Sequence, residues 1–164
     1  METFEVISRY TDAQAIEDGV LVAINRQDRV TRAVWEYLVE KAPKGSQPPS
    51  NWPVDMKGWF RAETIKREDA LKLICEFGKE GAQEKFEQIV ANRKALALTK
   101  ALIGTHRHTA RRVYEENTDG GIYKLFVVES GNTLASLGSV ETKTVLWLLP
   151  NENDGITLMF PEDY

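Results

Sequence analysis

A chain of 164 residues that is 42% hydrophobic and 28% charged has the composition of one globular domain, which we expect to span residues 1–164. Its single cysteine excludes an internal disulfide and a thiolate metal cluster, and no apolar run is long enough to cross a bilayer. We therefore expect a cytoplasmic protein with no membrane contact. The net charge of −4 is unevenly spread, because residues 61–112 carry +5 and residues 113–164 carry −7. This polarity allows a basic middle to meet an acidic partner.

The N-terminus predicts a strand followed by a helix. Phe4–Ile7 is a short apolar run and predicts the strand. Thr11 is followed three residues later by Gln14, the capping-box pattern that begins helices. Gly19 is the residue type that most often ends them. We therefore expect a helix over residues 11–18.

A second strand and a second helix are predicted next. Val20–Ile24 is an apolar run that predicts a buried strand, and Asn25–Arg29 is a polar connection. Thr31 is a candidate N-cap, and the apolar residues after it follow helical spacing. These features predict a helix over residues 31–42 that ends at Pro43.

The clearest loop in the sequence is Lys44–Pro53. It contains three prolines, which exclude a regular helix or a central strand. Trp52 lies within this loop. Because a large aromatic side chain gains most from burial, we expect Trp52 to fold back on the core, with an exposed contact for a partner as the alternative.

Residues 55–103 predict a helical insertion or sub-lobe. Ala70, Leu73, Ile74 and Phe77 form a stripe at helical spacing, and Gly78 is the expected end of that helix. Cys75 lies beside the stripe, so we interpret it as a small buried hydrophobe.

The following helix offers two candidate buried faces. One face carries Arg93 and Lys100 among its apolar residues, which are Phe86, Ile89, Val90, Leu96, Ala97 and Ile103. If this face is the buried one, the two cations must either extend their head groups to solvent or pair with a carboxylate. The other face leaves both cations in solvent and is formed by Ala91, Ala95, Leu98 and Leu102. The sequence does not choose between them.

The best candidate for a binding surface is the basic segment 93–112. Residues 92–112 contain no acidic side chain, and we expect the end of this run to follow a helix and precede a strand. A basic run of this kind favours a nucleic acid or an acidic protein surface as partner. The alternative is a solvated basic surface balanced by the acidic C-terminal third. The candidate binding residues are Arg93, Lys94, Lys100, His106, Arg107, His108, Arg111 and Arg112.

The last third of the chain predicts strands. Val113–Asn117 and Ile122–Glu129, joined by a turn at Asp119-Gly120, form a hairpin pattern. Ile122–Val128 is apolar on both faces, which predicts a central strand covered on both sides. Ser130–Ser139 is small and polar and predicts a loop. Two further strands are expected, at Thr144–Leu149 and at Ile156–Phe160.

The predicted fold class is α+β. Neither end of the chain has enough strands for a stable sheet by itself. We therefore expect a mainly antiparallel sheet built from the N- and C-terminal thirds, with the helical insertion 55–103 between them. The helices at 11–18 and 31–42 are expected to cover one face of this sheet.

Motifs for catalysis are sparse. The sequence has no phosphate-binding loop, no dinucleotide-binding turn, no nucleophile elbow and no zinc-binding helix motif. On a strand, His106 and His108 would point to the same face and could supply two ligands to a metal ion. No third ligand lies near them in the sequence. A carboxylate–histidine site would have to recruit Glu115, Glu116 or Asp119. We expect no cofactor and no catalytic residue.

Both ends of the chain resemble a family of uncharacterised bacterial proteins that occur widely on phages and plasmids. The resemblance rests on residues 7–22, on Thr31–Trp35, and on Gly155–Asp163. Many members carry Asp after the Leu-Val pair, where this chain has Ala23. The family implies a small accessory protein of a mobile element and assigns no activity.

Three functions are therefore considered. The first is a non-enzymatic accessory protein of a mobile element that binds nucleic acid or an acidic protein through segment 93–112. The second is an inhibitor of a host defence system that acts by protein–protein contact, with a surface that includes Trp52, Trp59 and Phe60. The third is a small enzyme with a carboxylate–histidine site.

Overall fold

A sheet built from both ends of the chain forms the centre of the fold. A computed structural model of the chain describes residues 11–41, 54–130, 133–137 and 143–164. The predicted strand at Phe4–Ile7 and the predicted loop at Lys44–Pro53, with Trp52, lie outside these residues. The strands are β1 (Leu21–Ala23), β2 (Arg29–Thr31), β3 (Tyr123–Ser130), β4 (Thr133–Leu137), β5 (Lys143–Pro150) and β6 (Ile156–Met159).

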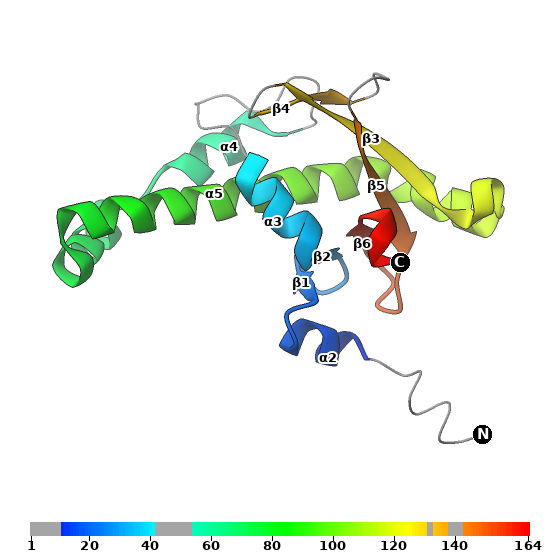
Figure 1. Ribbon diagram of the computed structural model, residues 1–164, viewed down its shortest axis with the longest axis horizontal. Helices are drawn as coiled ribbons and strands as arrows, with labels where there is room; N and C mark the ends of the chain where they lie inside the picture. Colours follow the sequence, from blue (N-terminus) through cyan, green and yellow to red (C-terminus); the bar gives the residue numbers. More distant parts are fainter. Residues whose placement is uncertain (1–10, 42–53, 131–132, 138–142) are drawn as a thin grey trace.

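The strand order is β1-β2-β6-β5-β3-β4. The pairing is antiparallel except between β2 and β6, where Val30 lies opposite Leu158 in parallel register. The N- and C-terminal strands therefore join in one mixed, mostly antiparallel sheet (Figure 1). This confirms the predicted α+β fold class.

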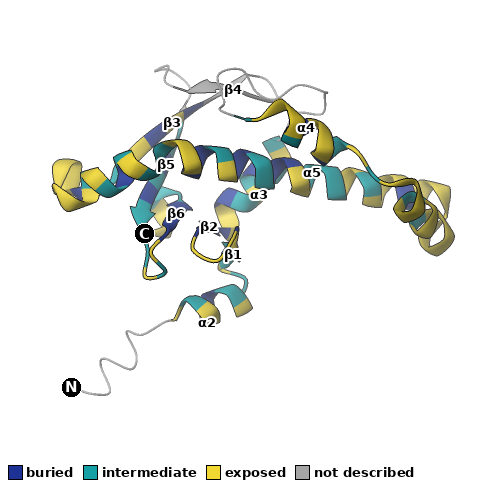
Figure 2. Ribbon diagram, turned by 180° about the vertical axis from the view of Figure 1, so that it is seen from behind, coloured by how far each residue is buried: buried dark blue, intermediate teal, exposed yellow. Residues whose placement is uncertain are grey.

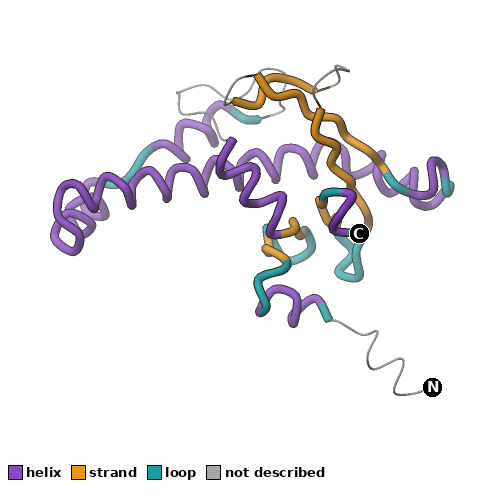
Figure 3. The backbone as a smooth tube through the Cα atoms, in the orientation of Figure 1, coloured by secondary structure: helices purple, strands orange, loops and turns teal. Residues whose placement is uncertain are grey.

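The helices are α2 (Asp12–Glu17), α3 (Arg32–Lys41), α4 (Met56–Glu63) and α5 (Arg67–Glu115), with short 3-10 helices η1 (Thr118–Gly121) and η2 (Pro161–Asp163). α3 and α5 pack on one face of the sheet, α4 packs on α5, and α2 lies at the opposite face, where Asp12 binds Arg29 of β2. The prediction that the helices at 11–18 and 31–42 cover the same face is therefore wrong. Figure 3 shows the long rod of α5 running past the strands with α3 beside it. Val34 and Leu38 of α3 and Leu98 and Leu102 of α5 are fully buried in one core cluster with apolar residues of the strands.

The other face of the sheet is covered at β2 and β6, where Arg29, Thr31 and Thr157 are buried, and is open at β3. Phe126 of β3 is 39% exposed, whereas its neighbours Leu125 and Val127 are buried. Successive side chains of a strand point to opposite faces, so β3 is covered on one side only. The prediction that this strand is covered on both sides is therefore wrong.

The N-terminal capping signals are confirmed. Thr11 and Gln14 form a capping box at the start of α2, and Gly19 adopts a positive φ of 77° after its end. The next strand was predicted less well. β1 is an edge strand, so Leu21 and Val22 are only half-buried and Ala23 is exposed. The prediction that this strand is buried is therefore wrong.

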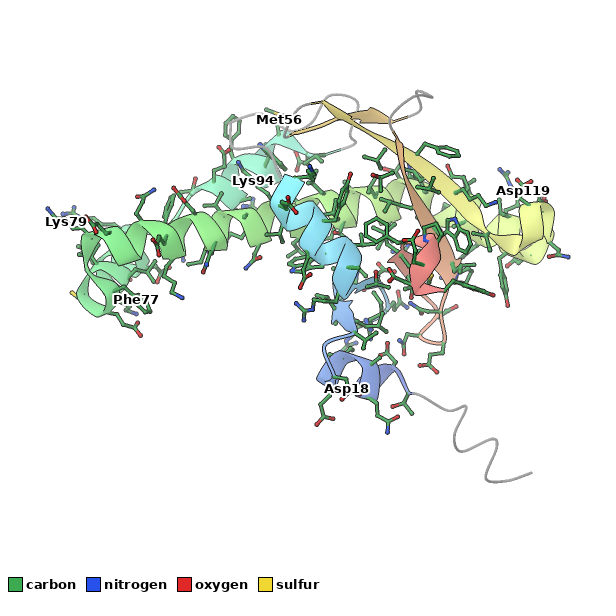
Figure 4. The ribbon with its side chains drawn as sticks, viewed as in Figure 1. Asp18, Met56, Phe77, Lys79, Lys94 and Asp119 are labelled. Carbon is green, nitrogen blue, oxygen red and sulfur yellow. The ribbon has the colours of Figure 1, made fainter. Side chains whose placement is uncertain are left out.

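The long helix extends further than the sequence predicts. The backbone leaves helical geometry at Gly78 (φ 75°, ψ 175°), as expected, but α5 then continues through Gly104 to Glu115. The predicted strand at Val113–Asn117 and its hairpin are therefore wrong, because α5 ends in this region and η1 follows. Asp119 and Gly120 still form a turn, both at positive φ, but it joins α5 to β3. Figure 4 shows Phe77 beside the break at one end of the molecule and Asp119 at the other end.

The structure chooses between the two candidate faces of α5. Ala95, Leu98 and Leu102 are fully buried, whereas Arg93 and Lys100 are exposed, so the second face forms the core, and Ile103 of the first face is buried beside it. The stripe before Gly78 behaves differently. Ile74 and Phe77 are both more than 40% exposed, and Cys75 is exposed, so its interpretation as a buried hydrophobe is wrong.

The remaining strands follow the sequence in part. β4 lies within the segment that the sequence predicts as a loop, Ser130–Ser139. The strands predicted at Thr144–Leu149 and Ile156–Phe160 are confirmed as β5 and β6. Among the described residues, no helix has the length and apolar character required to span a membrane.

Candidate nucleic-acid interface on α5

Several basic residues of α5 are used inside the fold. The Arg107 guanidinium donates two hydrogen bonds to the Asp28 carboxylate, at 2.8 Å and 2.5 Å. Asp28 lies in the connection between β1 and β2 and is only 3% exposed. Its carboxylate also accepts hydrogen bonds from the Asn25 amide and from the backbone N–H of Ile156. Arg107 therefore connects α5 to the N- and C-terminal parts of the sheet.

These contacts determine the charge state of the pair. Burial tends to raise the pKa of Asp28, but hydrogen bonds from Arg107, Asn25 and Ile156 lower the pKa below its ordinary value of 3.8. The hydrogen bond with Asp28 raises the pKa of Arg107. Both groups are therefore charged at neutral pH, and Arg107 is engaged with a carboxylate of its own chain.

Lys94 and Arg111 are also engaged within the fold. Lys94 is 3% exposed, and its ammonium lies 2.7 Å from the Glu63 carboxylate and 5.1 Å from the ring centroid of Trp59. Arg111 donates a hydrogen bond to the backbone carbonyl of Asp154 in the turn between β5 and β6. These two cations and Arg107 connect α5 to α4 and to the loops of the sheet.

The two histidines do not share a face. Both lie on a helix, where residues two apart point in different directions, so the expectation that they share one face of a strand is wrong. The Nδ1 atom of His106 lies 3.1 Å from the Tyr123 hydroxyl, whereas His108 is exposed. Among the described residues, no three His, Cys, Asp or Glu side chains are grouped so as to hold a metal ion. Glu115, Glu116 and Asp119 are exposed.

The environment of His106 predicts a dependence of stability on pH. Burial lowers the pKa of His106 below its ordinary value of 6.5, so the unfolded chain binds the proton more readily than the folded chain does. Stability should therefore be lost as the pH falls below 6.5. Urea unfolding between pH 7 and about pH 5 should show this loss in the native protein and a smaller loss in His106→Gln. An equal loss of stability in both proteins would mean that His106 is not the group whose protonation destabilises the fold.

The remaining cations lie on the side of α5 that faces away from the core, which we call the outer face. Arg93, Lys100, His108 and Arg112 are exposed, and at about 100° per residue they spread over an arc of roughly 120° of the helix surface. Ala97, Ala101 and Gly104 lie between them. Figure 2 shows α5 from behind, with no other element in front of its central part. One guanidinium nitrogen of Arg93 donates a hydrogen bond to the backbone carbonyl of Thr64. A guanidinium carries several N–H donors, so Arg93 has others to offer a partner.

The aromatic residues proposed for a protein-binding surface are separated by the structure. Trp59 is fully buried in the core, so it is not an exposed contact. Phe60, its neighbour on α4, is half-exposed. The predicted surface of Trp52, Trp59 and Phe60 therefore retains only Phe60 within the described residues.

A groove on the face of the sheet opposite α5 was not predicted from the sequence. It has a volume of about 790 Å³ and lies between α2, the first turn of α3 and the strands β1, β2 and β6. Its lining combines apolar residues such as Leu21 and Met159 with charged residues such as Arg32, Glu36 and Glu152. The residues come from three separate stretches of the chain, which explains why no local motif marks the groove.

Comparisons with known proteins add no functional assignment to this geometry. Neither the family models, nor the curated proteins, nor the solved structures contain a match to this sequence or fold.

Proposed function

We propose that this chain is a non-enzymatic binding protein that contacts duplex nucleic acid through the outer face of α5, as an accessory protein of a mobile genetic element. One observation carries the proposal. Residues 92–112 contain no acidic side chain, and Arg93, Lys100, His108 and Arg112 are exposed on one side of that helix. The other four predicted binding residues make contacts within the chain and are left out of the proposed surface. Lys94, Arg107 and Arg111 have internal partners, and His106 faces Tyr123.

The shape of the outer face fits a phosphate backbone. Arg93 and Arg112 are nineteen residues apart, which is roughly 28 Å along a helix and about eight base pairs of a duplex. The small side chains of Ala97, Ala101 and Gly104 allow close approach between the cations. The phosphate contacts would position the duplex without reading its sequence, so we expect little sequence preference.

The test is a salt titration of the full chain with a labelled duplex of mixed sequence, measured by fluorescence anisotropy. Arg93, Lys100 and Arg112 would release about three counterions, so log K should fall against log salt with a slope of roughly −2.7. Replacing Lys100 and Arg112 together with alanine should make that slope shallower by about 1.8. The matched control is Lys72→Ala with Lys79→Ala, which removes two exposed cations from α5 outside the acid-free segment.

Two outcomes would contradict this proposal. Absent or salt-insensitive binding by the native chain would remove nucleic acid as the partner. An equal loss in the two double variants would mean that net charge, and not the outer face, determines binding. Salt-sensitive binding to polyglutamate without binding to the duplex would favour an acidic protein as the partner instead.

A further inference from the structure

The groove on the face of the sheet opposite α5 has a negatively charged rim. Asp12 on its wall is neutralised, because the buried Arg29 guanidinium binds its carboxylate at 2.9 Å. The groove lining contains three further carboxylates, those of Glu36 of α3, Glu152 of the turn between β5 and β6, and Asp163 of η2. The rim is therefore acidic at three places that different elements supply.

One cation lies among the charged residues of the groove. Arg32 is exposed at the start of α3, and its Nε donates to the backbone carbonyl of Gly19. Asp163 accepts a hydrogen bond from the Thr31 hydroxyl at 2.7 Å, a neutral partner that leaves its charge in place. Three carboxylates and one guanidinium give this groove a net negative charge.

The floor between these carboxylates combines apolar side chains with the threonines Thr31 and Thr157, and its apolar part is the larger. It includes Ala15, Leu21 and Met159, and the half-exposed Val20 lies at its side. A hydrated metal ion or a simple polyamine would leave this floor in contact with water. A ligand that matches the whole groove must therefore combine positive charges with apolar groups. The volume of about 790 Å³ is in the range of established ligand sites.

We propose that this groove binds a cationic peptide segment of a partner protein, in which lysine or arginine side chains alternate with apolar ones. The cations meet Glu36, Glu152 and Asp163, and the apolar side chains cover Leu21 and Met159. Charge complementarity separates this surface from the outer face of α5, because a polyanion would be repelled by the groove. The two surfaces are therefore independent, and either one can fail its test without the other.

The test uses a short fluorescein-labelled peptide of alternating valine and lysine with the full chain. We expect saturable binding with one peptide per chain. Glu36→Gln together with Glu152→Gln should weaken it about tenfold, since each exposed ion pair contributes up to about fivefold. The amide that replaces the Glu152 carboxylate keeps an oxygen that accepts the Asp12 backbone N–H, so the wall of the groove is preserved. The control Glu40→Gln removes an exposed charge one turn further along α3, outside the groove.

Specific outcomes would overturn the proposal. These are no binding, equal binding of a valine–glutamate peptide, or an equal loss with Glu40→Gln. Full displacement of the peptide by spermidine at matched charge would also overturn it, because the apolar floor would then contribute nothing. Ala33→Trp provides a second test that does not depend on charge. Ala33 is exposed in the groove lining, so a bulky side chain there should block the peptide while the fold is retained.

Discussion

Replacing Asp28 with asparagine is expected to destabilise the fold by about 3 kcal/mol. The carboxylate is buried and accepts hydrogen bonds from Arg107, from Asn25 and from the backbone N–H of Ile156. The amide keeps the shape of the side chain but leaves the Arg107 guanidinium without its counter-charge. Urea unfolding of the native and variant chains at pH 7, followed by circular dichroism, measures the difference.

The matched control is Asp154→Asn. The Asp154 carboxylate lies 3.8 Å from the guanidinium of Arg111, and the Asp154 side chain is 90% exposed. In the variant, Arg111 keeps its hydrogen bond to the backbone carbonyl of residue 154. We expect a change below about 1 kcal/mol. Because the pKa of Asp28 is lowered, its contribution is present above pH 3.8 and is lost as the pH falls through the lowered value. Equal effects of the two substitutions would contradict the role given to Asp28.

Replacing Gly155 with alanine is expected to cost roughly 3 kcal/mol, the upper end of the usual range for overpacking. A Cβ atom at this position would overlap the backbone carbonyl of Gln27. Gln27 lies between β1 and β2, and Gly155 precedes β6, so the added methyl would separate the N-terminal hairpin from the C-terminal strands. Backbone atoms cannot rotate away as a flexible side chain can.

Gly58→Ala serves as the comparison for this substitution. Gly58 lies within α4, and a Cβ atom there meets nothing within 4 Å. Alanine should stabilise the helix by up to about 1 kcal/mol. Thermal unfolding of the two variants beside the native chain tests both expectations. A Gly155→Ala variant as stable as the native chain would mean that the two hairpins are not in close contact.

The sequence predicted those elements whose signals are local. The capping box at Thr11 and the stop at Gly19 depend on neighbouring residues, and β3, β5 and β6 are short segments rich in apolar residues. β2 was missed, because its three residues include Arg29 and Thr31, which are polar and are buried only by distant partners. α5 was predicted to be too short, because tertiary contacts override the low helix propensity of Gly104.

The candidate site was predicted as one surface and is divided by the structure. Helical spacing would have turned His106 away from Lys100, once the segment was known to be a helix. Spacing does not set Lys94 apart, because Lys94 points in the same direction as Arg112, and only its contacts with Glu63 and Trp59 bury it. The same spacing keeps Arg107 on the side of Lys100. Its partner Asp28 is 79 residues away in sequence, so no local pattern could show that this cation is occupied.

The most direct test of the proposed function is the mapping of backbone amide shifts in NMR spectra while a short DNA duplex is added. We predict that the shifts concentrate at the small residues of the outer face, Ala97, Ala101 and Gly104, and leave the loop around Asp28 unchanged. Shifts centred on the groove or on the open face of β3, or no shifts at a saturating duplex concentration, would contradict this prediction.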